Sequence, residues 1–391
     1  MRAIAGDACI VGVGHSEISR RSAKSLTALG IEACIAAIDD AGLKPADIDG
    51  LGGSSPPNLA DMVEGIGIPS LSWCSQGAWP ASQGVRAVHE AAMAVKTRAC
   101  NYALVYRGMA APRGGGSIAM RVKDGDGPLL MGGPNPAGTS QQWTAPYGGH
   151  TILTWLSLWM RRYMHEYDVP RETFGTIAVT CRKHAALNDR AVVRSPITMS
   201  DYLSSRWIAE PFCLYDCDFP VDGVAAVVVT GKDRARSLPH TPVGIVCGAA
   251  GVGPRPNWEQ WDDMRNMGAA YAGAKLWTLA EGLTPADVDV VELYDGFTFL
   301  TVQWLEALGF CAPGEAKEFV QGGRLEIGGE LPLNTNGGQL SEGRVHGMGL
   351  VAEAVLQLMG RCGARQVANA RVSVVSNGGG PAGAAILLRA G

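Results

Sequence analysis

Long apolar runs, blocks of like charge and paired cysteines are all missing from this sequence. No apolar run reaches the roughly 18–20 residues that a membrane-spanning helix needs, and the first residues lack the apolar stretch of a secretion signal. The net charge of −4 comes without a basic stripe, so neither nucleic acid nor a membrane surface is an expected partner. The ten cysteines include no CxxC pair, which excludes a zinc knuckle and a disulfide framework. These absences predict a cytoplasmic protein without a metal centre.

Hydrophobic residues and glycine are, by contrast, plentiful. Hydrophobic residues make up 47% of the 391-residue chain, which is enough for one large core or for two tightly joined domains. The 52 glycines gather in turns close to conspicuous polar residues. Because glycine lets the backbone approach a ligand closely, this clustering is consistent with a site lined by main chain.

A short phrase occurs twice in the sequence. Residues 42–49 read Gly-Leu-Lys-Pro-Ala-Asp-Ile-Asp, and residues 282–289 read Gly-Leu-Thr-Pro-Ala-Asp-Val-Asp. Each copy follows a helix-like segment and leads into a strand-like one. The same helix end, turn and strand start in both halves indicate that one structural unit was duplicated and fused. A site at the interface of two such units can draw residues from both.

The first copy belongs to a predicted alternation of strands and helices. Short apolar runs predict strands, and apolar residues at helical spacing predict helices. The strands are expected at 9–14, 102–106 and 222–230, and the helices at 26–41 and 87–95. This alternation is typical of a doubly wound α/β fold. Residues 1–240 are therefore expected to form an N-terminal half.

An insertion at about 108–215 interrupts this half. Its first part is rich in Gly, Pro and Ser and has no periodicity, which is typical of a lid, a partner-binding loop or disorder. Two helices are predicted after it, at 152–167 and 172–187. Arg182 and His184 are expected on the solvated face of the second helix.

Residues 241–391 are expected to form the C-terminal half. Strands are predicted at 243–247, 290–293, 372–375 and 384–388, and helices at 297–308 and 350–360. Polar turns interrupt these elements at three places. They are Glu292-Leu-Tyr-Asp-Gly-Phe297, the glycine-broken loop from Asn334 to Gly347, and Ser376-Asn-Gly-Gly-Gly380. Their side chains and free backbone amides are the candidate functional groups.

The three turns together resemble the motifs of the thiolase superfamily, and specifically of its thiolase-like lipid-transfer and acyl-CoA aldolase branch. Tyr294-Asp-Gly-Phe297 matches a strand-end motif of the type His-Asp-Cys-Phe. The loop from Asn334 to Gly347 keeps the glycine spacing of the family's second histidine motif. Ser376-Asn-Gly-Gly-Gly380 corresponds to its C-terminal Cys-Gly turn. The resemblance implies a thiolase-like α/β fold in which two duplicated βαβαβ-type halves are layered as α/β/α/β/α.

The groups that thiolases use for catalysis are replaced in this chain. The position of the acylated cysteine corresponds to Ser82, and that of the strand-end histidine to Tyr294. The loop histidine corresponds to Arg344, and the last cysteine to Ser376 or Asn377. Because Claisen chemistry needs a thiolate and a base that activates it, ordinary thiolysis is not expected.

The resemblance instead implies a retro-aldolase that cleaves a bulky β-hydroxyacyl-CoA of steroid type to a ketone and propionyl-CoA. The resembled aldolases have tyrosines at the positions of Tyr294 and Arg344. Tyr294 is therefore the candidate general acid/base, Arg344 the cation expected to make its phenol more acidic, and His346 a candidate proton relay. Oxyanion and substrate-binding roles are assigned to Ser82, Asn336, Asn377, Gly378, Gly379 and Gly380.

The resemblance also implies a homodimer and a small OB-fold partner subunit of the DUF35 type. The coenzyme A thioester is expected as the substrate, and no cofactor is expected besides. Two alternatives stay open. The chain could be an acyltransferase or thiolase that uses Cys74, in Trp73-Cys-Ser-Gln-Gly77, on a shifted loop. It could also be a non-catalytic lipid- or acyl-CoA-binding subunit of a complex.

Overall fold

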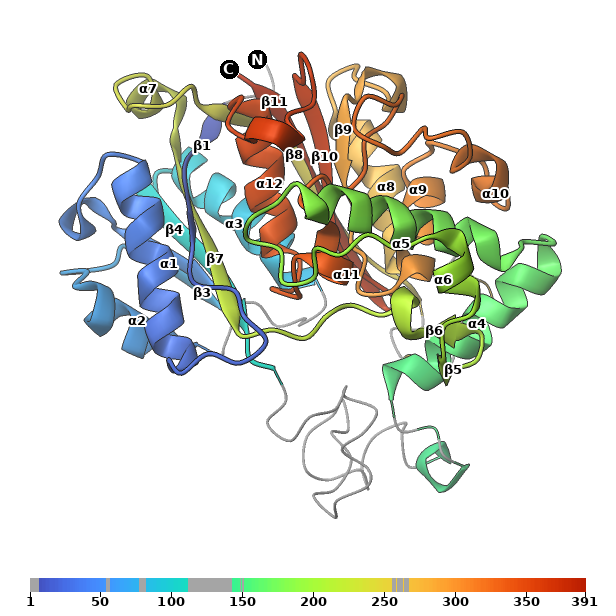
Figure 1. The fold of residues 1–391 in the computed structure, drawn as a ribbon. Coiled ribbons are helices and arrows are strands. Elements are labelled where there is room, and N and C mark those ends of the chain that lie inside the picture. The colour runs from blue at the N-terminus through green and yellow to red at the C-terminus, as the bar shows by residue number, and fades with distance from the viewer. Residues whose placement is uncertain are drawn as a thin grey trace.

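Two sets of strands meet edge to edge in one mixed sheet, and helices cover its faces (Figure 1). The computed structural model describes residues 7–53, 57–76, 82–111, 143–147, 149, 151–254, 258, 263 and 267–391. Within these residues the sheet has nine strands in the order β3-β2-β4-β7-β1-β8-β11-β10-β9. The N-terminal half of the chain supplies β1, β2, β3, β4 and β7, and the C-terminal half supplies β8, β9, β10 and β11.

Each half alternates strands and helices, as the sequence predicts. The N-terminal half consists of β1 (Ala8–His15), α1 (Leu26–Asp40), the 3-10 turn η1 (Pro45–Asp47), β2 (Gly50–Gly53), α2 (Leu59–Ile66), β3 (Trp73–Gln76), α3 (Gln83–Lys96), β4 (Tyr102–Met109), β7 (Gly223–Gly231) and α7 (Lys232–Ala235). The C-terminal half consists of β8 (Val243–Val252), α8 (Gly268–Leu279), η9 (Pro285–Asp287), β9 (Val290–Glu292), α9 (Thr298–Ala307), α10 (Ala316–Phe319), α11 (Gly338–Ser341), α12 (Met348–Leu358), η10 (Gly363–Arg365), β10 (Val372–Gly379) and β11 (Ala382–Ala390).

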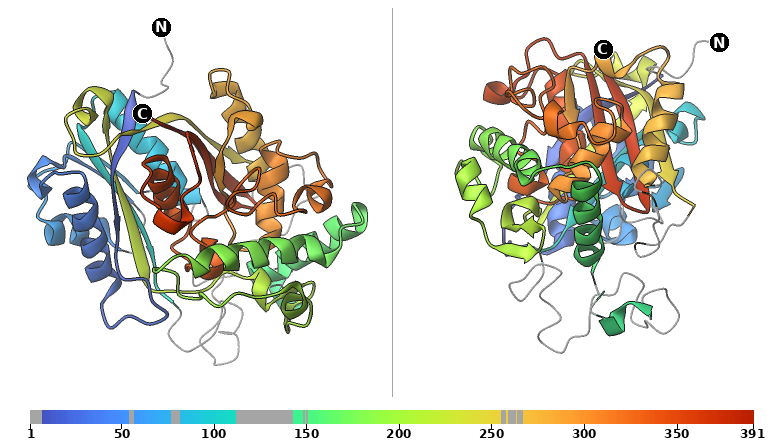
Figure 2. Two further views of the ribbon diagram at one scale, coloured as in Figure 1. Left: turned by 45° about the horizontal axis from the view of Figure 1, so that its top comes forward. Right: turned by 90° about the vertical axis from the view of Figure 1, so that its right-hand side faces the viewer.

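The strands of the two halves face each other across two helices. In the described part of β1, pairing with β8 is limited to Cys9 and Ile10, so the two sets of strands share one short edge. α3 and α12 contact strands of both halves and lie between them, as the left view of Figure 2 shows for α12. α1 packs on the outer side of the N-terminal strands, and α8 on the outer side of the C-terminal strands. The predicted α/β/α/β/α layering is confirmed.

The repeated phrase adopts the same structure in both halves. The glycine that opens each copy takes a left-handed backbone conformation, with φ of +69° in the first copy and +90° in the second. A 3-10 turn follows each glycine, and Asp49 then accepts a hydrogen bond from Tyr102 N at 2.8 Å, where β4 begins. Asp289 accepts one from Val372 N at 2.9 Å, where β10 begins. The last aspartate of each copy therefore fixes the start of a neighbouring strand, which supports the duplication.

The insertion supplies helices that pack on the C-terminal half. Its described elements are η6 (Ala145–Tyr147), α4 (Ile152–Glu166), α5 (Arg171–Ala186), α6 (Met199–Leu203), β5 (Trp207–Ala209), β6 (Phe212–Cys213) and η7 (Leu214–Asp216). α5 packs against α9, α10 and α11 (Figure 1). The rings of Tyr163 and Phe174 contact that of Phe299, with centroids 5.7 and 6.4 Å apart. A segment of the first half thus covers the helices of the second.

Two residues of α5 are buried, although the sequence predicts a solvated helix face. His184 Nδ1 lies 2.9 Å from the Leu333 carbonyl, and its Nε2 accepts a hydrogen bond from Ile327 N at 3.1 Å. Arg182 donates to Ser341 Oγ at 3.0 Å. The prediction is wrong because a loop of the C-terminal half covers this face of α5, and local periodicity carries no sign of that contact.

The strands at the end of the chain are longer than the apolar runs predict. β10 continues to Gly379, where the sequence predicts a turn, because Asn377 pairs with Ala384 and Gly378 with Gly383 across the ladder to β11. Polar residues and glycine look like a turn in the sequence, yet a partner strand holds them extended. β3 is a further strand that the sequence analysis did not predict.

Apolar side chains fill the spaces between the layers in three clusters. β7 is buried along most of its length, which agrees with its continuous run of valine and alanine. In the described part of the chain, no helix is both long and apolar enough to cross a membrane.

Candidate active site

Tyr294 lies where the chain leaves β9 and turns into α9. Asn334 fixes this exit, because its side chain accepts from Leu293 N at 2.7 Å and donates to Leu293 O at 2.9 Å. Tyr294 N donates to Ser376 Oγ of β10 at 3.0 Å. Only 7% of Tyr294 is exposed, so its phenol points into the protein.

His346 comes from the loop between α11 and α12 and meets Tyr294 there. The two ring centroids are 5.8 Å apart, and the ring planes are perpendicular at 90°. His346 has a φ of +55°, in the left-handed region, and Gly347 N is held by Gln339 Oε1 at 3.0 Å. A side chain at Gly338 would meet Asp295, which accepts a hydrogen bond from Gln339 N at 2.9 Å. The structure therefore brings Tyr294 against His346, which lies on a tightly built loop, as predicted.

Arg107 of β4 reaches the same point from the N-terminal half. Its Nη2 lies 2.8 Å from His346 Nδ1, and its Nη1 donates to the side-chain oxygen of Gln83. Arg107 is 6% exposed. The sequence analysis missed this residue, and the signal that could have found it is a charged residue directly after the buried apolar run 102–106. The site draws on both halves, as the duplication predicts.

Arg344 forms an ion pair with Asp218. Arg344 Nη1 lies 3.4 Å from Asp218 Oδ2, and the two side chains are only 14% and 9% exposed. Backbone bonds bring the segments together, since Arg344 N donates to Phe219 O at 2.9 Å and Asp218 N donates to Gly296 O at 3.2 Å. Asp218 was also missed from the sequence, because it lies in a segment without a motif.

Burial keeps both Tyr294 and His346 neutral. Burial raises the pKa of Tyr294 above its ordinary value, and the nearby charge of Asp218 raises it further. Arg344 and Arg107 lower the same pKa, but by less than burial raises it. Arg344 therefore lowers the pKa of the Tyr294 phenol, as predicted, but burial raises it by more. Burial, with Arg107 and Arg344, holds the pKa of His346 well below its ordinary value.

Hydrogen-bond donors outnumber acceptors at this point. Arg107 Nε and Arg344 Nε are buried nitrogens that have no hydrogen-bond partner among the described residues. The guanidinium groups of Arg107 and Arg344 both act on the Tyr294 phenol, and Arg344 is the one that pairs with the Asp218 carboxylate. A buried group of this kind is suited to an anionic, acceptor-rich ligand.

Asn377 joins the site through its side chain. Its Oδ1 accepts from Gly84 N at 3.0 Å, at the start of α3, and its Nδ2 donates to the His346 carbonyl at 3.3 Å. Ser82 occupies the position before α3 and is buried. The structure thus brings Asn377 to the loop of His346 and to the helix that follows Ser82, and both polar atoms of Asn377 are engaged.

The glycines after Asn377 approach neighbouring side chains closely. Gly378 O accepts from Trp304 Nε1 at 2.8 Å, and Gly380 O accepts from Gly268 N at 2.8 Å. A side chain at Gly379 would meet Leu300 at 2.8 Å. These contacts explain the need for glycine, while the predicted oxyanion roles of Gly378, Gly379 and Gly380 stay predictions.

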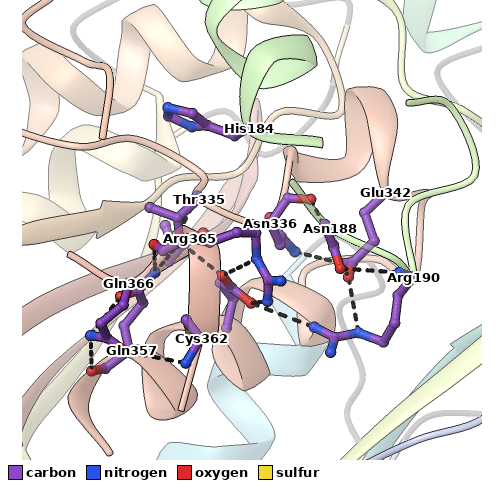
Figure 3. A network of polar contacts seen from close by, with 12 residues as sticks. His184, Asn188, Arg190, Thr335, Asn336, Glu342, Gln357, Cys362, Arg365 and Gln366 are labelled. Atoms are coloured by element: carbon purple, nitrogen blue, oxygen red, sulfur yellow. Dashed lines mark hydrogen bonds and ion pairs between the residues drawn. The ribbon is translucent and has the colours of Figure 1, made fainter. Parts of the chain in front are cut away.

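Asn336 belongs to a separate buried network rather than to the group around Tyr294 (Figure 3). Its Nδ2 donates to Glu342, and its Oδ1 accepts from Gly338 N at 2.8 Å. Arg190 pairs with Glu342 at 3.3 Å in the same network. All the side-chain polar atoms of Asn336 are used there, so its contacts are those of a residue that shapes the loop.

Cys74 lies on β3, at the edge of the sheet. It is exposed, and its neighbours across the ladder are residues of β2. No thiol is among the groups whose charge acts on Tyr294 or His346 within the described residues. The structure therefore places the one candidate nucleophile apart from the site, and residues 77–81, which follow it, lie outside the described residues.

Comparison with known proteins gives matches along both halves of the chain. A family model described as thiolase C-terminal domain-like matches residues 253–388. The steroid side-chain-cleaving aldolase of Thermomonospora curvata is 39% identical over 369 residues, which cover 92% of this chain and 92% of the aldolase. The 17-hydroxy-3-oxo-4-pregnene-20-carboxyl-CoA lyase of Mycobacterium tuberculosis is 38% identical over 371 residues, which cover 91% of this chain and 92% of the lyase.

A solved structure gives the same result in three dimensions. A protein described as an Ltp2-ChsH2(DUF35) aldolase superimposes with a TM-score of 0.90 at 37% sequence identity. The match covers 100% of this chain and 99% of that one. The similarity therefore includes the site and the insertion.

Proposed function

This chain belongs to the thiolase superfamily and, within it, to the family of the steroid side-chain-cleaving aldolases, and we propose that it is a carbon–carbon lyase. Its proposed substrate is a bulky β-hydroxyacyl-CoA with a steroid side chain, and its products are a ketone and propionyl-CoA. The observation that carries the proposal is the buried group of Tyr294, His346 and Arg107, which offers a phenol and unpaired donors but no thiol.

The reaction needs proton transfers and a place for negative charge. A base removes the proton of the β-hydroxyl group, the carbon–oxygen bond becomes a ketone, and the bond between Cα and Cβ breaks. Its electron pair moves into the thioester, which becomes an enolate with charge on oxygen. A proton added at Cα gives propionyl-CoA, so the reaction consumes no water. Donors placed at the enolate oxygen lower the barrier.

Asp218 and Tyr294 are the proposed proton carriers. Because burial keeps the phenol of Tyr294 protonated, it is suited to give a proton to Cα. The hydroxyl proton then requires another acceptor, and Asp218 is the carboxylate whose charge acts on that phenol. Burial raises the pKa of Asp218 above its ordinary value, which makes it a stronger base than a solvated aspartate. Arg344 keeps the carboxylate in place through their ion pair.

The site residues retained from the sequence take supporting roles in this proposal. His346 donates toward the enolate oxygen, and Asn377 holds the His346 loop against α3. Gly378 to Gly380 and Ser82 line the approach of the thioester. Asn336 shapes the loop through Glu342.

The proposed assembly contains a small OB-fold subunit of the DUF35 type and two copies of this chain. Support for the small subunit comes from the solved aldolase, which is described as a complex with a DUF35 protein. We propose that the protein acts in the cytoplasm on a coenzyme A thioester and uses no other cofactor.

The test is turnover of a panel of β-hydroxyacyl-CoA thioesters by the purified chain, alone and with its DUF35-type partner. The panel should include a steroid side chain, a bile-acid-like side chain and an aromatic side chain. Mass spectrometry should detect propionyl-CoA and the matching ketone in equal amounts. Thiolysis products, or no cleavage with either preparation, would contradict the proposal. Turnover by the purified chain alone would exclude a mere acyl-CoA-binding subunit.

A further inference from the structure

We propose that Arg107 is a positioning residue of the active site, which fixes the tautomer of His346 and leaves a positive charge beside the reacting thioester. The kinetic part of this inference rests on the lyase function proposed above. The structural part, which concerns the proton on His346, does not depend on it.

The contact between Arg107 and His346 decides where the imidazole proton lies. A guanidinium group can only donate hydrogen bonds, so at 2.8 Å from Arg107 Nη2 the Nδ1 atom of His346 must be an acceptor. A neutral imidazole carries its single proton on the other nitrogen, Nε2. His346 is neutral because its pKa lies well below the ordinary value. The ring therefore presents an Nε2–H donor in the site.

Among the residues that the structure describes, no carboxylate pairs with the buried charge of Arg107. In the described part of the chain, its hydrogen-bond partners are Gln83 and His346, which are both neutral, and its Nε has none. Burial lowers its pKa to about 10, which still leaves the group charged at neutral pH. A buried unpaired charge destabilises the fold, and a bound anion would remove that cost.

Two other buried arginines differ from Arg107 in different ways. Arg365 is buried to a similar extent, and it pairs with Glu353 at 2.9 Å. Arg182 is buried too, and it has neutral partners in Ser341 Oγ and Ser195 O. Unlike Arg182, Arg107 faces a histidine and a tyrosine of the active site and acts on the pKa values of both.

The position of Arg107 in the fold suits this role. It lies near the end of β4, where it pairs with Ala225 of β7, one residue beyond the last pair between β4 and β2. His346 lies on a loop of the other half. The bond between them therefore links the halves at the site, and a strand residue sets the direction of a loop histidine. The anion that this charge and the Nε2–H group would hold is the thioester enolate oxygen.

The test combines kinetics and nitrogen NMR on Arg107→Met and Arg107→Lys, measured in the complete complex. In the wild type, histidine ¹⁵N spectra should show His346 with a bare, hydrogen-bonded Nδ1 and a protonated Nε2; His346→Gln identifies its signals. Arg107→Met should move the Nδ1 signal and populate the Nδ1–H form. It should lower kcat about 10²- to 10³-fold with a smaller change in KM, because charge is stabilised at the transition state.

Arg107→Lys keeps a charge and a donor in the site, so it should recover part of kcat and most of the wild-type NMR pattern. Arg182→Met is the matched control, since it removes a buried guanidinium elsewhere and should leave the His346 signals unchanged. Thermal unfolding of each variant shows whether it is folded.

Two outcomes would overturn the inference. They are a wild-type His346 that carries its proton on Nδ1, and an Arg107→Met variant whose His346 signals do not move. If instead the wild type cleaves none of the thioesters, the lyase proposal fails, and the NMR result still decides the role of Arg107.

Discussion

The loop between Asn334 and Gly347 contributes residues to two buried polar clusters. The two clusters differ in whether their charged groups are paired. The first is the site cluster of Tyr294, His346, Arg107, Arg344 and Asp218. The second, the network cluster of Figure 3, contains Asn336 and Glu342 together with Asn188, Arg190, Thr335, Glu353, Gln357 and Arg365. Most of these side chains are buried; the exception is Arg190 at the rim of the network cluster, whose side chain is 33% exposed.

The network cluster is closed. Arg365 pairs with Glu353 at 2.9 Å, and Arg190 pairs with Glu342 at 3.3 Å, so two positive charges meet two negative ones. Thr335 Oγ1 lies 2.9 Å from both Glu292 Oε1 and Glu353 Oε1. One hydroxyl proton cannot serve two carboxylates, and burial raises the pKa of Glu292 well above its ordinary value. A protonated Glu292 that donates to Thr335 resolves the contact, although its Oε2 has no partner.

The site cluster is open. Arg344 pairs with Asp218, Arg107 has no carboxylate partner, and the Nε atoms of both arginines have no acceptor among the described residues. An unsatisfied buried group costs stability, while a satisfied one holds structure in place. The comparison teaches that charge balance, more than burial or residue type, separates the part of this loop that builds the fold from the part that awaits a ligand.

The strongest way to break this comparison is Tyr294→Phe. Loss of the phenol should lower kcat about 10³- to 10⁴-fold, which corresponds to roughly 4–5.5 kcal/mol, because the acid that protonates Cα is removed. Stability should fall by only about 1 kcal/mol, because the change removes one hydrogen bond, between the phenol and the Gln339 side chain. Steady-state cleavage and thermal unfolding measure the two effects. Activity close to that of the wild type would remove Tyr294 from the mechanism.

Glu353→Gln tests the closed cluster. Arg365 and Arg190 would lose a buried counter-charge, so the free energy of unfolding should fall by about 3–5 kcal/mol. Equilibrium denaturation measures this change. The matched variant Glu330→Gln, which removes an exposed partner of Arg324, should cost about 1 kcal/mol or less. A small loss in Glu353→Gln would show that the network does not hold the loop.

Asp218→Asn sharpens the assignment of the base. We expect a loss of about 10²-fold in kcat/KM, because the amide cannot take the hydroxyl proton. In the wild type, kcat/KM should rise with pH as Asp218 deprotonates, and the raised pKa of Asp218 places this rise above the range of an ordinary aspartate. The pH–rate profile of the variant should lack the acidic limb. A limb that persists would assign it to another group.

Glu306 gives a pH test outside both clusters. Burial raises its pKa to about 7, so the folded state holds a proton that the unfolded chain has lost. Its contribution to stability is therefore present at acidic pH and disappears as pH rises from about 5 to about 8. Glu306→Gln keeps the oxygen that accepts from Tyr163 and Gly314 N and should flatten this part of the curve by about 1–3 kcal/mol. Denaturation from pH 5 to 8 measures it.

The pH experiment has a built-in reference. Burial also raises the pKa of Asp295 to about 7, and that carboxyl group is unchanged in Glu306→Gln. Some fall in stability with rising pH should therefore remain. A curve identical to that of the wild type would show that Glu306 is ionised in the folded protein.

The smallest expected effect belongs to Cys74. Its replacement by alanine, or its alkylation with iodoacetamide, should leave cleavage within about twofold of the wild type, because it is exposed on an edge strand. Inactivation by alkylation that Cys74→Ala prevents would favour the acyltransferase alternative.

The sequence carried much of the fold because its signals are local. The repeated phrase ends a helix and starts a strand with the same residues in both copies, so duplication is visible without coordinates. The motif around Tyr294 and the loop with Arg344 and His346 were likewise found from spacing. The sequence predicts too short a β10 and a solvated face on α5. Both predictions are wrong because the length of β10 and the burial of α5 depend on partners far away in the chain.

By itself, the sequence determined the two halves, the loss of the thiolase cysteine and histidine groups, and the presence of Tyr294 and His346 in one loop system. Only the tertiary structure decided which charges surround them. Arg107 and Asp218 stand in segments far from the motifs, and their effect on a phenol or an imidazole exists only across space. Electrostatic interaction depends on distance and burial, and neither of these is written in residue order.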